Sequence, residues 1–159
     1  MMRLGHWLAF ILCLAGAAAA APEVSPSTVA RDPDAWIISP AEADLPLGRQ
    51  LLSERSDPDG PKVIVRDPGE VAEVTPPVTI DVAFEADAGA AVDLKSLKVI
   101  YLKLFGIDIT KRLRPYLTAD GIHAVNAPLA PGHHTIEISV NDTAGRRTVE
   151  RFSFTVLRR

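Results

Sequence analysis

The chain has 159 residues, of which 47% are hydrophobic and 23% are charged, and its formal net charge at pH 7 is −3. Its only cysteine, Cys13, lies in an apolar N-terminal stretch, which excludes a disulfide-stabilised scaffold for the remainder of the chain. Residues 22–159 are numerous enough to fold as one domain around a hydrophobic core.

Residues 1–21 have the three parts of a secretory signal peptide. Arg3 supplies a positive charge, residues 8–14 are strongly apolar, and an alanine run offers a small-residue cleavage site. The alternative is a retained membrane anchor, but the apolar part is shorter than the about 20 residues that a span needs. Leu12, before Cys13, is not the small residue expected for lipidation. We therefore expect export to a periplasm, or else to the cell surface or medium, without a membrane span after cleavage.

Residues 22–61 are predicted to form a linker that contains one short helix. Proline, serine and alanine dominate residues 22–34 without periodicity, which is typical of an extended segment. Residues 36–38 are an isolated Trp-Ile-Ile cluster, too short to be an element, which should dock on another part of the chain. An early proline followed by leucines at helical spacing predicts an amphipathic helix near residues 46–55.

From Lys62 onward, apolar residues alternate with period two, the pattern of half-buried strands. Turn-forming residues separate these runs at short intervals, and little helical periodicity remains. We expect strands at residues 62–66, 78–85, 97–105, 107–110, 122–125, 135–140 and 151–156. This pattern predicts an all-β fold, an antiparallel immunoglobulin-like β-sandwich of about seven strands that spans residues 62–159.

Two stretches resemble bacterial immunoglobulin-like domains of exported proteins. In residues 129–146, a leucine and a Pro-Gly-His-His loop precede an alternating strand, and an Asp-Thr-Ala-Gly turn leads into the last strand. Residues 107–110 look like the mid-domain hairpin of that family. The resemblance covers residues 62–157 and implies a spacer, binding module or accessory domain of the cell envelope. The chain lacks the cysteine pair of antibody domains, so antigen-type recognition does not carry over.

The run at residues 97–105 is apolar in both phases of a strand. Its first face holds Leu97, Val99, Tyr101 and Phe105, and its second face holds Ile100, Leu102 and Leu104. A strand that is apolar on both faces must be covered on both. We expect an N-terminal lid over the second face that consists of Trp36, Ile37 and Ile38 together with Leu47, Leu51 and Leu52 of the predicted helix. The alternative is an exposed patch for a partner or for self-association, and the oligomeric state stays open.

The small net charge hides an asymmetry between two parts of the chain. Residues 22–93 contain 15 acidic and 5 basic side chains, whereas residues 94–159 contain 5 acidic and 11 basic ones. If the basic groups converge, they form an anion-facing surface of Lys111, Arg112, Arg114, Arg146, Arg147 and Arg151. The alternative is that the acidic part neutralises them.

The partner of such a surface would be an envelope protein, an acidic polysaccharide or a lipid head group. Nucleic acid is disfavoured because of the export signal and because the sequence shows no aromatic stacking platform.

The sequence contains no pattern typical of nucleophilic catalysis, such as Gly-x-Ser-x-Gly, and no glycine loop for phosphate. His133 and His134 are adjacent in a predicted strand, so they point to opposite faces and cannot easily share a metal. His134 is in phase with Ile136 and is expected to cap the core or bond a loop. Asp142 is expected to form a turn rather than a calcium site.

We therefore expect no cofactor, no metal and no enzymatic activity. The sequence favours an exported binding or assembly module of the cell envelope. One alternative is an accessory domain with enzymatic or metal-dependent activity on envelope polymers, and another is a structural spacer.

Overall fold

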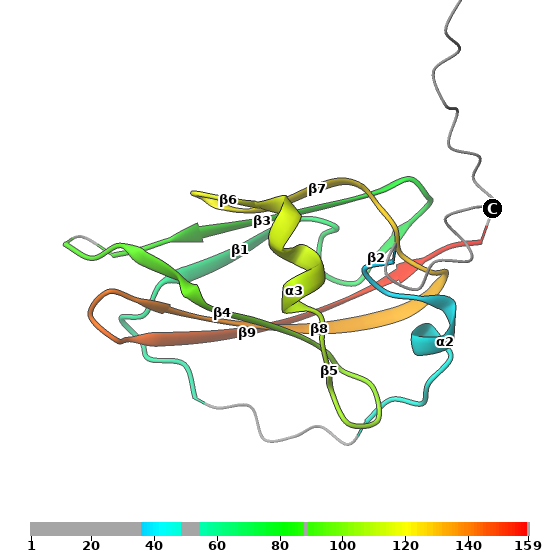
Figure 1. The fold of residues 1–159 in the computed structure, drawn as a ribbon, viewed down its shortest axis with the longest axis horizontal. Coiled ribbons are helices and arrows are strands. Elements are labelled where there is room, and N and C mark those ends of the chain that lie inside the picture. Colours follow the sequence, from blue (N-terminus) through cyan, green and yellow to red (C-terminus); the bar gives the residue numbers. More distant parts are fainter. Residues whose placement is uncertain (1–35, 49–54, 88, 159) are drawn as a thin grey trace, which may run out of the picture.

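Two facing sheets form the body of the part of the chain that the structure describes (Figure 1). The computed structural model describes residues 36–48, 55–87 and 89–158. The strands are β1 (Lys62–Asp67), β2 (Ala72–Val74), β3 (Val78–Glu85), β4 (Val92–Tyr101), β5 (Ile107–Asp108), β6 (Leu117–Thr118), β7 (Gly121–Ala127), β8 (Gly132–Asp142) and β9 (Arg147–Val156). The helices are α2 (Pro40–Ala43), α3 (Thr110–Leu113) and the 3-10 helix η2 (Arg114–Tyr116).

The strand order identifies the sandwich as immunoglobulin-like. One sheet has the order β1-β3-β7-β6 and the other β2-β9-β8-β4-β5, which correspond to the ABED and GFC sheets of that fold. The predicted strands omitted β2 and β6, which are too short to show an alternating pattern. In addition, β2 pairs with β9 in parallel, so the sandwich is not purely antiparallel.

Inward-facing side chains of both sheets form one hydrophobic core. The most deeply buried apolar residues include Val82, Val99, Ile122, Ile138 and Phe154. The described residues contain no cysteine. The sandwich therefore depends on apolar packing where antibody domains have an inter-sheet disulfide.

The central strand β4 ends at Tyr101, earlier than the run at residues 97–105 predicts. The Lys103 amide donates to the Tyr101 carbonyl at 3.0 Å, which turns the chain away from the sheet. Leu97, Val99 and Tyr101 are buried on one face, as predicted. Phe105 does not share that face, because it lies in the loop after β4 and is 85% exposed.

Residues 36–48 pack against the sandwich. Ile37 and Ile38 are 2% and 0% exposed, so the expectation that this cluster docks is confirmed. Ile38 forms a parallel bridge with Leu129, and its carbonyl accepts a hydrogen bond from the Ala130 amide at 3.1 Å. The two isoleucines thereby belong to the core itself.

A short helix that the sequence did not predict, α2, precedes the segment in which a helix was expected. Ser39 and Glu42 form a capping box, in which the Ser39 amide donates to the Glu42 carboxylate at 2.9 Å. Ser39 is therefore the N-cap, and α2 begins at Pro40. Asp44 is the C-cap of α2, and residues 46–48, where the predicted helix was expected to begin, are not helical. The remaining part of the predicted helix, residues 49–54, lies outside the described residues.

Contacts before β1 show that the packed unit begins upstream of residue 62. The Ser56 hydroxyl accepts from the Val149 amide at 2.8 Å and donates to the Val149 carbonyl at 2.9 Å. The Asp57 carboxylate accepts from the Arg147 amide at 2.8 Å. This stretch therefore lines the first half of β9, whereas β2 pairs with its last residues.

Replacing Ile38 with alanine should lower the free energy of unfolding by about 2–5 kcal/mol, because it removes a fully buried side chain and leaves a cavity. Leu47→Ala is the matched control in the same segment, since Leu47 is 60% exposed, and should change stability by less than about 0.5 kcal/mol. Urea denaturation measures both changes. Equal, small effects of the two substitutions would contradict the docking of residues 36–38 in the core.

Candidate functional site

Two hollows lie between β4 and the short helices α3 and η2. Figure 1 shows α3 at the side of the sandwich, next to β4. The two hollows have volumes of about 420 and 480 Å³ and share Leu97, Thr110 and Arg114 as lining residues. Together we call them the β4–α3 groove, which is defined by the residues that line the two hollows.

The floor of the β4–α3 groove is apolar. It consists of Leu94, Leu97, Leu113 and Leu117. Leu97 and Leu113 are core residues with 8% and 4% exposure, and the other two are partly buried against the core. Ile109 and Leu113, four residues apart, both point into the core and hold α3 in place.

Basic side chains surround this floor. The lining residues include the exposed Lys95, Lys98, Lys111 and Arg114. Asp108 is the only carboxylate in the lining. Hydrogen bonding with Thr110 lowers the pKa of Asp108, and the charges of Lys98 and Lys111 act in the same direction. The groove therefore has an excess of positive charge.

A bulge in β4 turns side chains toward the groove. Residues 94–97 face a single residue of β8, so the regular register is interrupted there. Asp93 binds the Lys95 amide with its carboxylate at 3.0 Å, and the Ser96 hydroxyl accepts from the Asn141 amide at 2.8 Å. These contacts hold an irregular backbone whose side chains line the groove, a frequent use of bulges at functional sites.

The edge of β4 next to the groove is only partly covered. β5 pairs with Ile100 and Tyr101 alone, and the Thr110 hydroxyl accepts from the Val99 amide at 2.8 Å. Within the described ranges, no strand pairs with this side of β4 at residues 94–98. The groove therefore combines an apolar floor, basic side chains and an open strand edge.

The structure brings only two of the six predicted basic residues into this groove, Lys111 and Arg114. Arg112 instead forms two hydrogen bonds of 2.8 Å with the Glu42 carboxylate and donates to the Ile37 carbonyl at 3.0 Å. Burial alone would raise the pKa of Glu42, but hydrogen bonding with Arg112 helps to hold it below its ordinary value. Through these hydrogen bonds, Arg112 of α3 binds the N-terminal segment.

The other three predicted basic residues lie on the β8–β9 hairpin. Arg146 pairs with the buried Asp142 at 2.7 Å, and Arg151 pairs with Glu137 at 2.7 Å. Arg147 donates to the Ser139 hydroxyl at 3.2 Å. Asp142 also accepts backbone amides two and four residues further on, which confirms its predicted role in the turn. Three of the six basic residues are therefore paired with carboxylates of this chain, and two line the groove.

Two basic residues of the groove, Lys95 and Lys98, were missed by sequence reasoning, as was α3. The sequence signal for the two lysines is that they interrupt an otherwise apolar run. Residues 111–118 have the composition of an irregular basic connection, and nothing in the local pattern predicts the helical turn at Thr110–Leu113.

The predicted apolar contact face is partly exposed. Its half-buried members are Trp36, Ile100 and Leu102, whereas Leu104 is 47% exposed. The Leu104 amide donates to the Pro46 carbonyl at 3.1 Å, so the segment after α2 lies beside this loop. Ile37 and Ile38 belong to the core with Val99 rather than covering the second face of the run at residues 97–105, and Leu47 is 60% exposed, so this part of the predicted lid is wrong. Leu51 and Leu52 lie outside the described residues, and their part in a lid stays a prediction.

A buried histidine connects β8 to the preceding loop and to β4. His134 is 0% exposed; its Nε2 donates to the Ala130 carbonyl at 2.8 Å and its Nδ1 accepts from the Tyr101 hydroxyl at 3.1 Å. Burial lowers the pKa of His134 more than the Ala130 contact raises it. The prediction that His134 bonds a loop is confirmed, and both ring nitrogens are used within the core.

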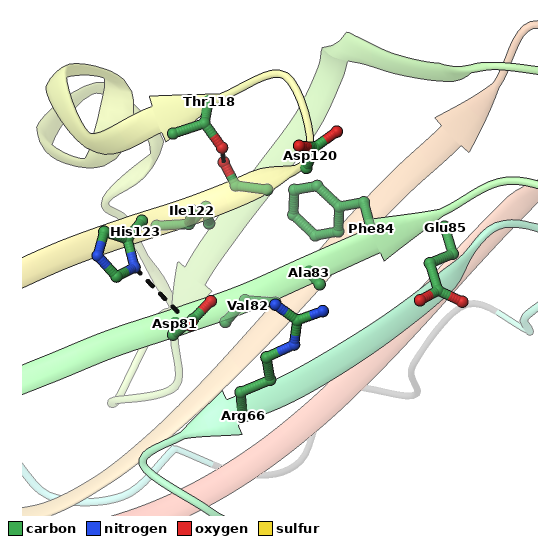
Figure 2. A pocket seen from close by; sticks show the side chains of 11 residues that line it. Arg66, Asp81, Val82, Ala83, Phe84, Glu85, Thr118, Asp120, Ile122 and His123 are labelled. Carbon is green, nitrogen blue, oxygen red and sulfur yellow. Dashed lines mark hydrogen bonds and ion pairs between the residues drawn. The ribbon is translucent and has the colours of Figure 1, made fainter.

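A larger hollow of about 580 Å³ lies over the four-stranded sheet (Figure 2). Its lining includes the charged Arg66, Asp81, Glu85 and Asp120 together with His123. His123 Nδ1 lies 3.8 Å from Asp81 Oδ2, and Arg66 supplies a second basic group. In the described part of the chain, no three potential metal ligands converge. This hollow has charges of both signs and offers a weaker basis for ligand recognition than the groove.

Comparisons with known proteins add little to this description. No family model and no curated protein matches the chain. Among solved structures, it is similar to a structure of murine CRIg, an immunoglobulin-like domain, with 13% identity, a TM-score of 0.37, and coverage of 62% of this chain and 98% of that chain. No helix in the described ranges is long and apolar enough to span a bilayer. The immunoglobulin-like fold is therefore assigned from the observed strand order and not from this similarity.

His134→Gln should remove part of the pH dependence of stability. The folded-state pKa of His134 lies below the ordinary value of 6.5, so the contribution of His134 is complete above that pH. As the pH falls below it, the unfolded chain takes up the proton first, and the wild type loses stability at up to about 1.4 kcal/mol per pH unit. Urea denaturation from about pH 7 to 5 measures this slope.

His133→Gln is the matched control, because this neighbouring histidine is exposed. It should retain the wild-type slope. An unchanged slope in His134→Gln would contradict the assignment of a buried, neutral imidazole.

Proposed function

We propose that this protein is an exported, non-catalytic binding module of the cell envelope that recognises an anionic ligand in the β4–α3 groove. The observation that carries the proposal is the groove lining, in which four exposed basic side chains and one carboxylate surround a leucine floor. Residues 1–21, with the pattern of a secretory signal, support export. The immunoglobulin-like fold is compatible with a binding or a structural role, so the argument rests on the site.

Three arginines outside the groove are paired with acidic side chains, whereas the groove has more basic than acidic side chains. Arg112, Arg146 and Arg151 each bind a carboxylate of this chain. The basic groups of the groove outnumber its single acid, Asp108. Basic side chains that share a concave surface raise the local potential and attract anions. Each contact is weak by itself at an exposed position, so affinity depends on several contacts together and decreases with salt.

The residues of the groove support binding rather than catalysis. Its lining has no histidine, cysteine or tyrosine that could act as base or nucleophile. Asp108 has a lowered pKa and therefore stays ionised, which makes it a poor proton donor. A protein segment, an acidic polysaccharide and a lipid head group all offer the anionic chemistry that the groove would bind.

The double variant Lys98→Glu/Arg114→Glu should lose affinity for polyanions, because it reverses two charges of the groove. The probes are a poly-glutamate peptide, a sulfated polysaccharide and vesicles with an anionic lipid, titrated at low and physiological salt. At least one probe should bind the wild type in a salt-dependent manner, and the variant should bind it at least about tenfold more weakly.

The control is Lys62→Glu/Arg66→Glu, which makes the same change in net charge on exposed residues of β1, in the other sheet. It should retain most of the affinity. Equal losses in both variants would show that only net charge matters, and the absence of binding to every probe would favour a spacer.

A further inference from the structure

We infer that the ligand of the β4–α3 groove is an extended acidic polypeptide segment. It would add as a short strand to the open edge of β4 and place an apolar side chain on the leucine floor. This inference rests on the proposed function and narrows its ligand to one class.

The backbone of β4 is partly open on the side of the groove. In the part of the chain that is described, no strand pairs with residues 94–98 on the groove side, whereas β5 covers Ile100 and Tyr101, and α3 and the residue before it bind the amide and carbonyl of Val99. The Lys95 amide is bound by the Asp93 carboxylate, so an added strand would use the other backbone groups of this stretch. An open strand edge presents amides and carbonyls that another strand can bind. Peptide addition to such an edge obtains affinity from main-chain hydrogen bonds and specificity from side-chain pockets. The covered residues limit the added strand to a short one.

Apolar and basic side chains both lie around that edge. Successive side chains of an extended peptide point in opposite directions. One set would contact the floor that Leu97 and Leu117 help to form, and the other set would point toward the exposed cations. Lys95 and Lys98 lie on β4, and Lys111 and Arg114 lie across the groove. A segment in which acidic and apolar residues alternate would satisfy both surfaces at once.

The same features disfavour the other anionic ligands. A polysaccharide would place hydroxyl groups on an apolar floor, and the groove lining contains no aromatic ring on which a sugar could stack. A lipid head group would use the cations but would leave the strand edge of β4 unused. Only a polypeptide uses the cations, the floor and the edge together.

The test uses labelled octapeptides and fluorescence anisotropy with the full chain. The main probe alternates glutamate and leucine. In the first control serine replaces leucine, in the second lysine replaces glutamate, and in the third alternate amides of the Glu-Leu peptide are N-methylated so that they cannot donate hydrogen bonds. The Glu-Leu peptide should bind at least about tenfold more tightly than each control.

The Lys98→Glu/Arg114→Glu variant should weaken binding of the Glu-Leu peptide at least about tenfold, and Lys62→Glu/Arg66→Glu should leave it within about twofold. Amide chemical shifts provide a second readout that depends on no substitution. Addition of the peptide should move the shifts of residues 94–98 and leave those of residues 81–85 in place.

Two outcomes would overturn the inference in different ways. If the N-methylated peptide binds as well as the Glu-Leu peptide, strand addition is wrong. If the sulfated polysaccharide or the anionic vesicles bind in the groove and no peptide does, the ligand class is wrong while the proposed function stands. If no polyanion of any class binds, both proposals fail.

Discussion

The open side of the sandwich between β4 and β6 must be covered, and a single helical turn covers it. Ile109 and Leu113 place fully or nearly buried side chains between the sheets, and Thr110 binds the Val99 amide. Because α3 is only four residues long, it seals the core without covering β4 further toward its start. The β4–α3 groove is the direct consequence of this incomplete closure.

The same helical turn connects the N-terminal segment to the groove. Arg112 binds Glu42 and the Ile37 carbonyl, whereas Lys111 and Arg114 line the groove. Lys111 and Arg114 are three residues apart and therefore lie on one side of the turn. Adjacent basic residues thus have different roles, one structural and two available to a ligand. The burial of Ile37 supports the position of Arg112 and, through it, of α3.

Charge is distributed differently in the hollow over the four-stranded sheet and in the β4–α3 groove. The hollow over the four-stranded sheet contains Asp81, Glu85 and Asp120 together with Arg66 and His123 (Figure 2). Groups of opposite sign at exposed positions interact weakly and largely cancel at a distance. The groove has one predominant sign and an apolar floor, so it can combine electrostatic attraction with apolar contact. Because of this difference, the groove is the better candidate for a ligand site.

Alternation alone predicted the bounds of β3 and located the central part of β8 and the last part of β9, because one face of each strand is buried there. It misplaced the end of β4, where the Leu104 amide donates to the carbonyl of the distant Pro46, and it did not predict α2, although Ser39 and Glu42 have the spacing of a capping box. The sequence by itself determined a two-sheet core without a disulfide, since that depends on periodicity and composition. Only the tertiary structure decided which basic groups face a ligand, because pairs such as Arg112–Glu42 join residues 70 positions apart.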